Sequence, residues 1–169
     1  VNEEPVFGRI FSQKEWKESQ AYQALCAQTA VKKMRKLGID GMLWCCLTSG
    51  ANDGSYMKPI IDFYGYKKLG FYALSDSYRN IYACKNDSYV SYGTENELQP
   101  VILNTSCAGT YSLCVEVLGE DGTKKDEKIY EGIKVCAEDS VIELSPFKPV
   151  WEKKGYYTLC YKLCKTSDE

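Results

Sequence analysis

Hydrophobic positions follow two different repeats along the chain. From Ser12 to Gly38, apolar residues recur near one face of a 3.6-residue repeat, the spacing of an amphipathic helix. After Ser88, apolar and polar residues alternate with a period of two, the spacing of half-buried strands. The pattern therefore predicts a helical first part and a strand-rich second part, with a domain boundary near residue 86.

The first helix has recognisable signals at both ends. Ser12 and Glu15 have the spacing of a capping box, in which a hydroxyl and a carboxylate satisfy exposed backbone amides. Basic residues crowd positions 32–36, where the helix dipole favours cations, and Gly38 suits the left-handed residue that stops a helix. A helix is expected between these two signals.

A buried strand and a second helix are predicted next. Residues 41–47 contain no polar side chain, which is typical of a parallel strand buried on both faces. Turn-forming residues fill 48–55, and the periodicity predicts a helix from Lys68 to Cys84. Two helices cannot cover both edges and both faces of one such strand. The first part is therefore expected either to dock on another chain or to complete strands encoded upstream.

The second part predicts a small antiparallel sandwich. Short alternating segments lie at fairly even spacing with no helical pattern between them, and Glu120-Asp-Gly122 is typical of a hairpin turn. The predicted strands are 89–92, 101–103, 111–117, 141–144 and 156–161.

Charge and hydropathy exclude several partners. The chain has 21 basic and 23 acidic residues spread along its length, so neither nucleic acid nor an anionic membrane is expected to bind. No apolar run reaches the roughly 20 residues that span a bilayer, and the first residues lack the pattern of a secretory signal.

The nine cysteines favour free thiols. They are odd in number and lack paired spacing, and the chain contains no histidine. We therefore expect no disulfide framework, no metal, no cofactor and a cytoplasmic location, with bacterial secretion left open because a natural amino terminus is expected upstream. The sequons at Asn86 and Asn104 would matter only in a secreted eukaryotic protein. Without histidine, a Ser-His-Asp or Cys-His mechanism is excluded.

The order of these features resembles the end of the barrel in glycoside hydrolase family 2, which includes β-galactosidases, β-glucuronidases and β-mannosidases. In that family a long helix leads to an eighth strand like Gly-x-Leu-x-Trp, which resembles Gly41-Met-Leu-Trp44. An Asp-Tyr-Tyr-Gly-x-x-Lys segment and an aromatic helix follow, similar to residues 62–68 and to Phe71-Tyr72 here. Residues 109–113 and 155–159 are similar to strands of the immunoglobulin-like domains that these enzymes often carry.

The resemblance implies an α+β multidomain fold. Residues 1–86 would be the carboxy-terminal helix-strand-helix segment of a TIM-type (β/α) barrel, and residues 87–169 an immunoglobulin-like antiparallel β-sandwich. The two glutamates of the family's retaining mechanism end strands four and seven, ahead of the helix at Ser12, so no catalytic residue is expected here. Glu3 and Glu4 are interpreted as exposed charges near a terminus. The expected partners are the missing amino-terminal part of the same polypeptide and, through that parent enzyme, a carbohydrate substrate.

Three residues are candidates for contact with that substrate. Trp44 lies in the predicted barrel strand. Function in such barrels sits at the carboxy-terminal ends of the strands, and an indole can stack on a sugar, with packing in the barrel core as the alternative. The family continues this strand with Gln-Leu-Asn-Asp, whereas Asn52 and Asp53 come later here, in a loop. Asp53 also suits a cap on its own turn, which is the commoner role. Asp62 is expected to be a cap or turn residue ahead of the second helix.

A second class of function fits the same sequence. The fourteen tyrosines favour either a sugar-binding face or ordinary filling of the sheets. The chain would then be a non-catalytic module whose sandwich binds polysaccharide or protein, with the helical part as an adaptor. Exposed apolar surface on residues 42–47 would support the fragment, and a fully covered fold would support the module.

Overall fold

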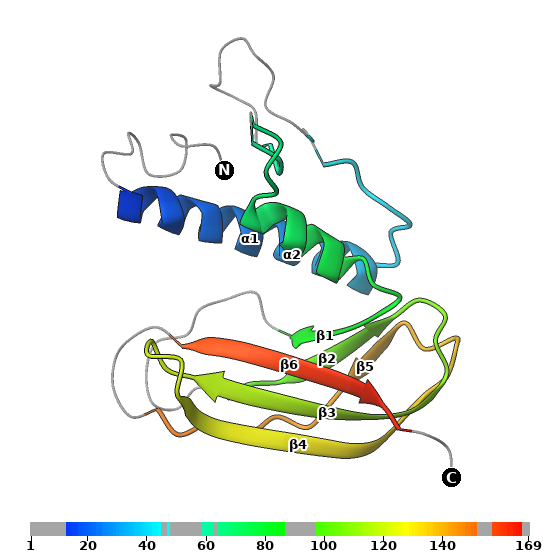
Figure 1. Cartoon of the computed structure of the whole chain (residues 1–169). Helices are drawn as coiled ribbons and strands as arrows, with labels where there is room; N and C mark the ends of the chain where they lie inside the picture. The colour runs from blue at the N-terminus through cyan, green and yellow to red at the C-terminus, as the bar shows by residue number, and fades with distance from the viewer. Residues whose placement is uncertain are drawn as a thin grey trace. The chain divides into compact units, whose positions relative to one another are not determined.

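The computed structural model describes residues 13–44, 47, 59–62, 64–86, 97–151 and 157–166, with side chains from residue 19 onward. The chain divides into two compact units, here named the helical unit (Val1–Arg79) and the sheet unit (Asn80–Glu169). The helical unit contains α1 (Gln13–Lys36) and α2 (Leu69–Ser77), and neither is long and apolar enough to cross a membrane. The strands described in the sheet unit are β1 (Ile81–Lys85), β2 (Pro100–Asn104), β3 (Gly109–Leu118), β4 (Lys124–Val135), β5 (Val141–Glu143) and β6 (Thr158–Lys165) (Figure 1).

Helix α1 confirms the predicted first helix and its stop. Gly38 has a φ of 67°, the left-handed conformation that glycine adopts without strain. Its N–H donates to the Arg35 carbonyl at 3.2 Å, and the Ile39 N–H donates to the Met34 carbonyl at 3.1 Å. These are the two hydrogen bonds of a Schellman motif. The capping box predicted at the other end lies outside the side chains that the structure describes.

Helices α1 and α2 pack against each other around a small hydrophobic core (Figure 1). The buried residues of this core are Ala27, Val31, Met34, Ile60 and Leu74. At the carboxy end of α2, the Arg35 guanidinium donates to the carbonyls of Ser77 at 2.8 Å and Arg79 at 3.0 Å. A cation at this end of a helix complements its dipole, so the contact also ties α1 to α2 electrostatically.

The strand predicted at residues 41–47 is wrong for the residues that the structure describes there. Gly41 to Trp44 form no strand, and the Leu43 side chain is 100% exposed. A strand buried on both faces needs neighbouring strands along its edges, and the described residues of the helical unit contain no strand. The Leu47 carbonyl instead accepts the Ile61 N–H at 2.9 Å.

The second helix is shorter than predicted. Helix α2 ends at Ser77 rather than Cys84, and residues 81–85 form β1. Strand β1 pairs antiparallel with β2. Its neighbouring residues Ala83 and Cys84 belong to two different hydrophobic clusters, so both faces of the strand are covered. In residues 81–85, strand pairing and burial on both faces therefore outweigh the helical spacing of the apolar residues. The compact sheet unit begins at Asn80, just ahead of β1, and the domain boundary near residue 86 stays a prediction.

The described strands of the sheet unit form two antiparallel sheets that share one core. Their strand orders are β1-β2-β5 and β4-β3-β6. Alternate residues of β3, including Leu113 and Val115, pack with Ile102 of β2 and Val135 of β4. The antiparallel, half-buried strands agree with the predicted pattern, and the arrangement is compatible with a β-sandwich. The strand predicted at 89–92 lies outside the described residues.

Local turn chemistry fixes the β3–β4 hairpin. The Asp121 carboxylate accepts hydrogen bonds from the Thr123 N–H at 3.0 Å and its hydroxyl at 2.7 Å, and Gly122 has a φ of 75°. The hairpin turn predicted at this position is therefore confirmed. Further along β4, Gly132 has a φ of 64° beside a register shift, which is the geometry of a β-bulge.

Asn104 is a buried polar residue at the end of β2 whose side chain joins three segments. Its amide nitrogen donates to the carbonyls of Cys107 at 3.0 Å, Cys136 at 3.1 Å and Asp139 at 3.0 Å. Its oxygen accepts the Cys107 N–H at 2.9 Å. The amide thus forms hydrogen bonds with backbone groups of the loops after β2 and β4. Buried backbone carbonyls and N–H groups need such partners.

Candidate functional site

Trp44 is half-buried and lies against the core of the helical unit. With Met42 and Phe71 it packs on the buried cluster of α1, α2 and Ile60. The Met42 carbonyl accepts a hydrogen bond from the Tyr78 hydroxyl at 3.4 Å. These contacts are those expected if Trp44 packs in the protein interior, while its contact with a sugar stays a prediction.

The other predicted contact residues lie outside the described residues. This applies to Asn52 and Asp53, and also to Glu3 and Glu4, which were predicted to have no catalytic role. The contact of Asn52 and Asp53 with a sugar therefore stays a prediction.

Asp62 is a turn residue, as the sequence predicted. One carboxylate oxygen accepts hydrogen bonds from the N–H groups of Tyr64 at 2.9 Å and Tyr66 at 2.8 Å. The tyrosine side chains on this turn are 81% and 72% exposed, respectively. The carboxylate thus organises the backbone ahead of α2, where the Lys67 ammonium lies 4.6 Å from the centre of the Phe71 ring.

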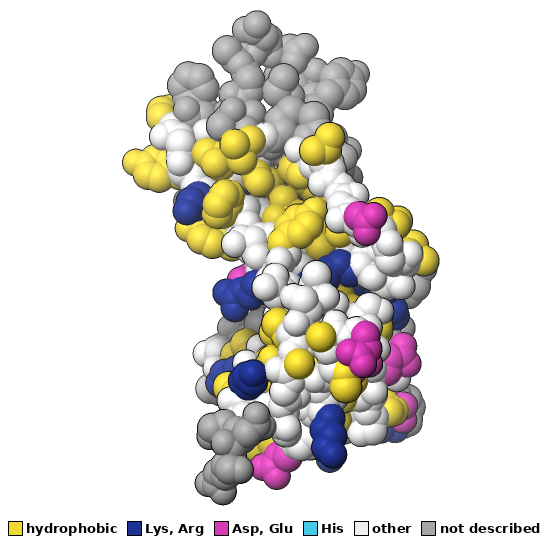
Figure 2. All heavy atoms as spheres, turned by 90° about the vertical axis from the view of Figure 1, so that its right-hand side faces the viewer, with side chains coloured by type: hydrophobic (Ala, Val, Ile, Leu, Met, Phe, Trp, Pro, Cys, Tyr) yellow, Lys and Arg dark blue, Asp and Glu magenta, His cyan; other side chains and the backbone are white. Residues whose placement is uncertain are grey.

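Large hydrophobic side chains are exposed mainly on the helical unit. In Figure 2 hydrophobic side chains gather over the part that carries the two helices. In the sheet unit, Ile129 and Val150 are the large hydrophobic residues with exposed side chains among those described. The corresponding residues of the helical unit are Tyr22, Leu25, Leu37, Ile39, Leu43, Leu47, Tyr64, Tyr66, Leu69, Tyr72 and Tyr78. A surface of this kind is typical of an interface.

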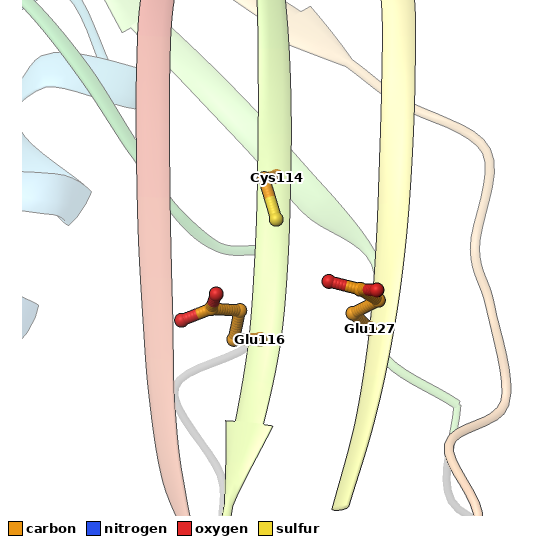
Figure 3. Close-up of side chains that lie close together, drawn as sticks. All are labelled: Cys114, Glu116 and Glu127. Carbon is orange, nitrogen blue, oxygen red and sulfur yellow. The ribbon is translucent and has the colours of Figure 1, made fainter. Parts of the chain in front are cut away.

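A thiol and two carboxylates meet on sheet β4-β3-β6, a cluster that the sequence analysis missed (Figure 3). The Cys114 sulfur and one oxygen each of Glu116 and Glu127 lie within 4.8 Å of one another. Alternation along β3 could have placed the first two on one face. The third joins them because Glu127 of β4 pairs with Glu116, and that register was not predictable from the pattern.

Each carboxylate of this cluster forms an ion pair with a lysine. The Lys162 ammonium lies 2.7 Å from a Glu116 carboxylate oxygen, and the Lys124 ammonium lies 2.9 Å from a Glu127 oxygen. Burial, followed by the two carboxylates, raises the pKa of the Cys114 thiol, which favours the protonated form. A metal ion here would have to displace two lysines and deprotonate this thiol, so the geometry favours a structural role.

Comparison by sequence finds no relative. No protein-family model matches the chain, and no curated protein matches it.

Solved structures, however, resemble it over nearly its whole length. The exo-chitosanase CsxA of Amycolatopsis orientalis matches with a TM-score of 0.68 and 15% identity, over 94% of this chain and 19% of that chain. The β-D-mannosidase of Dictyoglomus thermophilum matches with a TM-score of 0.55 and 16% identity, over 95% of this chain and 19% of that chain. The chain shares its fold with part of these two enzymes.

This likeness confirms the coarser part of the fold prediction. An α+β chain with two helices followed by antiparallel sheets occurs within larger proteins named as glycosidases. The chain spans 19% of the length of each solved chain, so the likeness concerns the fold of that portion. At 15–16% identity it carries no information on residue roles.

Proposed function

We propose that this chain is the carboxy-terminal part of a retaining glycosidase of the family 2 type. The observation that carries the proposal is a fold shared over 94% of this chain with 19% of an exo-chitosanase. The helical unit would close a (β/α) barrel, and the sheet unit would be an immunoglobulin-like sandwich that buttresses it. The two catalytic carboxylates, about 5 Å apart in such enzymes, would come from strands preceding this chain.

The exposed surface of the helical unit supports this proposal over the non-catalytic module. A module that folds independently covers its own apolar residues, because each buried leucine contributes about 1.5–3 kcal/mol of stability. Leu43 is instead 100% exposed in a segment without any polar side chain from Gly41 to Trp44. The surface is what a barrel segment shows when its neighbouring strands are absent.

The proposed partners and location follow from the same assignment. The helical unit binds the preceding part of the same polypeptide, and the parent enzyme binds a carbohydrate, with Asn52 and Asp53 as proposed contacts. The nine cysteines, odd in number and without paired spacing, support the proposal of a reducing cytoplasm.

The test compares this chain with the complete product of its gene. We expect the purified 169-residue chain to show no turnover of nitrophenyl glycosides, because under this proposal the two catalytic carboxylates come from the preceding strands. The complete product should hydrolyse at least one member of a panel with β-glucosaminide, β-mannoside, β-galactoside and β-glucuronide. Efficient turnover by the chain alone, a native start codon at Val1, or a complete product inactive on the whole panel would contradict the proposal.

A further inference from the structure

The side chains of residues 42–44 point to two different sides. Met42 and Trp44 are half-buried and pack on the cluster formed by α1, α2 and Ile60. Leu43, between them, has its side chain completely exposed. This alternation is the side-chain pattern of an extended segment, although the structure assigns no strand there.

In a (β/α) barrel the two sides of each strand meet different surroundings. Alternate residues face the surrounding helices, and the residues between them point into the barrel, where layers of Val, Ile and Leu fill the interior. The helices that belong to this segment, α1 and α2, are present and already contact Met42 and Trp44. The side that lacks neighbours is therefore the side of Leu43.

We propose that Leu43 is the residue of this segment that packs into the interior of the parent barrel, whereas Met42 and Trp44 hold its helices against the barrel wall. The inference rests on the proposed function and names the surface through which this chain joins the preceding strands. It assigns Trp44 to packing rather than to contact with the sugar, which resolves the two alternatives left by the sequence.

The occupant of the Leu43 side follows from three observations. The solved chains that share this fold are longer, with 19% of their length matched, so the same fold occurs as part of a larger protein. The segment from Gly41 to Trp44 forms no strand here, although its side chains alternate as those of a strand do. The neighbouring positions are apolar, as the interior of a parallel barrel requires. The occupant is thus a set of parallel strands with an apolar interior face.

The test places one substitution in two contexts. In the isolated 169-residue chain, Leu43→Asp should leave the unfolding midpoint in urea unchanged, because the side chain has no contacts to lose. In the complete gene product the same substitution should lower the melting temperature by about 4 °C or more, since it puts a carboxylate into an apolar layer. Leu43→Met should be tolerated in both contexts, because it conserves volume and hydrophobicity.

Ile129→Asp provides the matched control, because this side chain is 54% exposed on the sheet unit. It should be nearly silent in both contexts. Equal melting temperatures for Leu43→Asp and Ile129→Asp in the complete product would overturn the inference, and so would an equal loss from Leu43→Asp in the isolated chain. An unchanged KM in Trp44→Leu is also expected, and a rise of tenfold or more would contradict the packing role. Failure of the proposed function is distinguishable from failure of this inference, because the unsubstituted complete product would then be inactive.

Discussion

The two units of this chain differ in how they cover their hydrophobic residues. In the sheet unit the inward residues of one sheet meet those of the other, as Leu113 of β3 and Ile102 of β2 do. In the helical unit the described residues bury a small cluster between α1 and α2 and leave a larger set of leucines and tyrosines exposed. The described residues of one chain thus include a unit with a core shared by two sheets and a unit that leaves many hydrophobic side chains exposed. Under the proposed function, the core of the helical unit would continue in the preceding strands.

The same contrast appears at single leucines. Leu113 is fully buried between two sheets, and Leu43 is fully exposed although its neighbours in sequence are apolar. Both belong to segments that sequence analysis predicted as strands, so hydrophobicity alone does not distinguish them. What distinguishes them is that Leu113 lies on a strand paired along both edges, whereas the described residues around Leu43 form no strand.

Separating the units should give the largest effect. We expect residues 80–169 expressed alone to unfold cooperatively in urea, because both sheets and their shared core are retained. Residues 1–79 alone should bind a hydrophobic dye and unfold without a sharp transition, since much apolar surface stays exposed. Circular dichroism and dye fluorescence would measure both properties. A cooperatively folding, monomeric 1–79 fragment would remove the basis of the comparison.

Truncating the two leucines should sharpen the comparison. Leu113→Ala is expected to destabilise the sheet unit by about 3 kcal/mol, because it creates a cavity in the core. Leu43→Ala should change stability by less than about 0.5 kcal/mol in this chain, since no contact is lost. Urea titrations of the 169-residue chain followed by circular dichroism give both values. Similar losses from the two variants would show that Leu43 is covered in solution.

Replacing a buried polar residue should cause the next largest loss of stability. Asn104→Ala should cost the sheet unit about 2 kcal/mol or more, because three carbonyls and one N–H lose a shared partner. Asn86→Ala is the matched control, because that amide donates to the side chains of Gln99 at 2.9 Å and Glu143 at 3.3 Å near the surface. Its expected cost is about 0.5 kcal/mol. If urea midpoints ranked the two variants in the reverse order, the role assigned to Asn104 would be wrong.

The smallest expected effect concerns Tyr161 and alkaline pH. Burial raises the pKa of its phenol above the ordinary value of 10.0, and its hydroxyl has no hydrogen-bond partner among the described residues. The unfolded chain therefore loses this proton first, so the stability of the sheet unit should fall as the pH rises above 10. Tyr161→Phe should be neutral or stabilising by up to about 1 kcal/mol at pH 7 and should weaken the alkaline loss. Unfolding midpoints at pH 7 and above pH 10 would reveal either result, and an unchanged pH profile in the variant would contradict the assignment.

Much of the fold could be predicted from local signals. The periodicity and Gly38 located helix α1 and its end. The alternation located most of β2, β3 and β5 and the first half of β6. Asp121 and Gly122 gave the hairpin turn, and Asp62 was correctly predicted as a turn residue. These features depend on neighbours in sequence, which a single chain displays directly.

The remaining features depend on contacts distant in sequence. Residues 81–85 satisfy a helical spacing, and only their pairing with β2 makes them a strand. Conversely, residues 41–44 have strand composition but form no strand. The cluster of Cys114 with two glutamates depends on a cross-strand register. The side on which Trp44 lies likewise required the packing of α1 and α2, which composition does not specify.

The hydrogen bonding around Asn104 also protects the chain against chemical ageing. Deamidation of asparagine requires the backbone nitrogen of the next residue to attack the side-chain carbonyl carbon and expel ammonia. Here the Thr105 N–H is held by the Asn80 carbonyl at 2.9 Å, and the leaving nitrogen is held by three carbonyls. Both the attacking and the departing groups are fixed, so conversion to aspartate at this position has to wait for local unfolding.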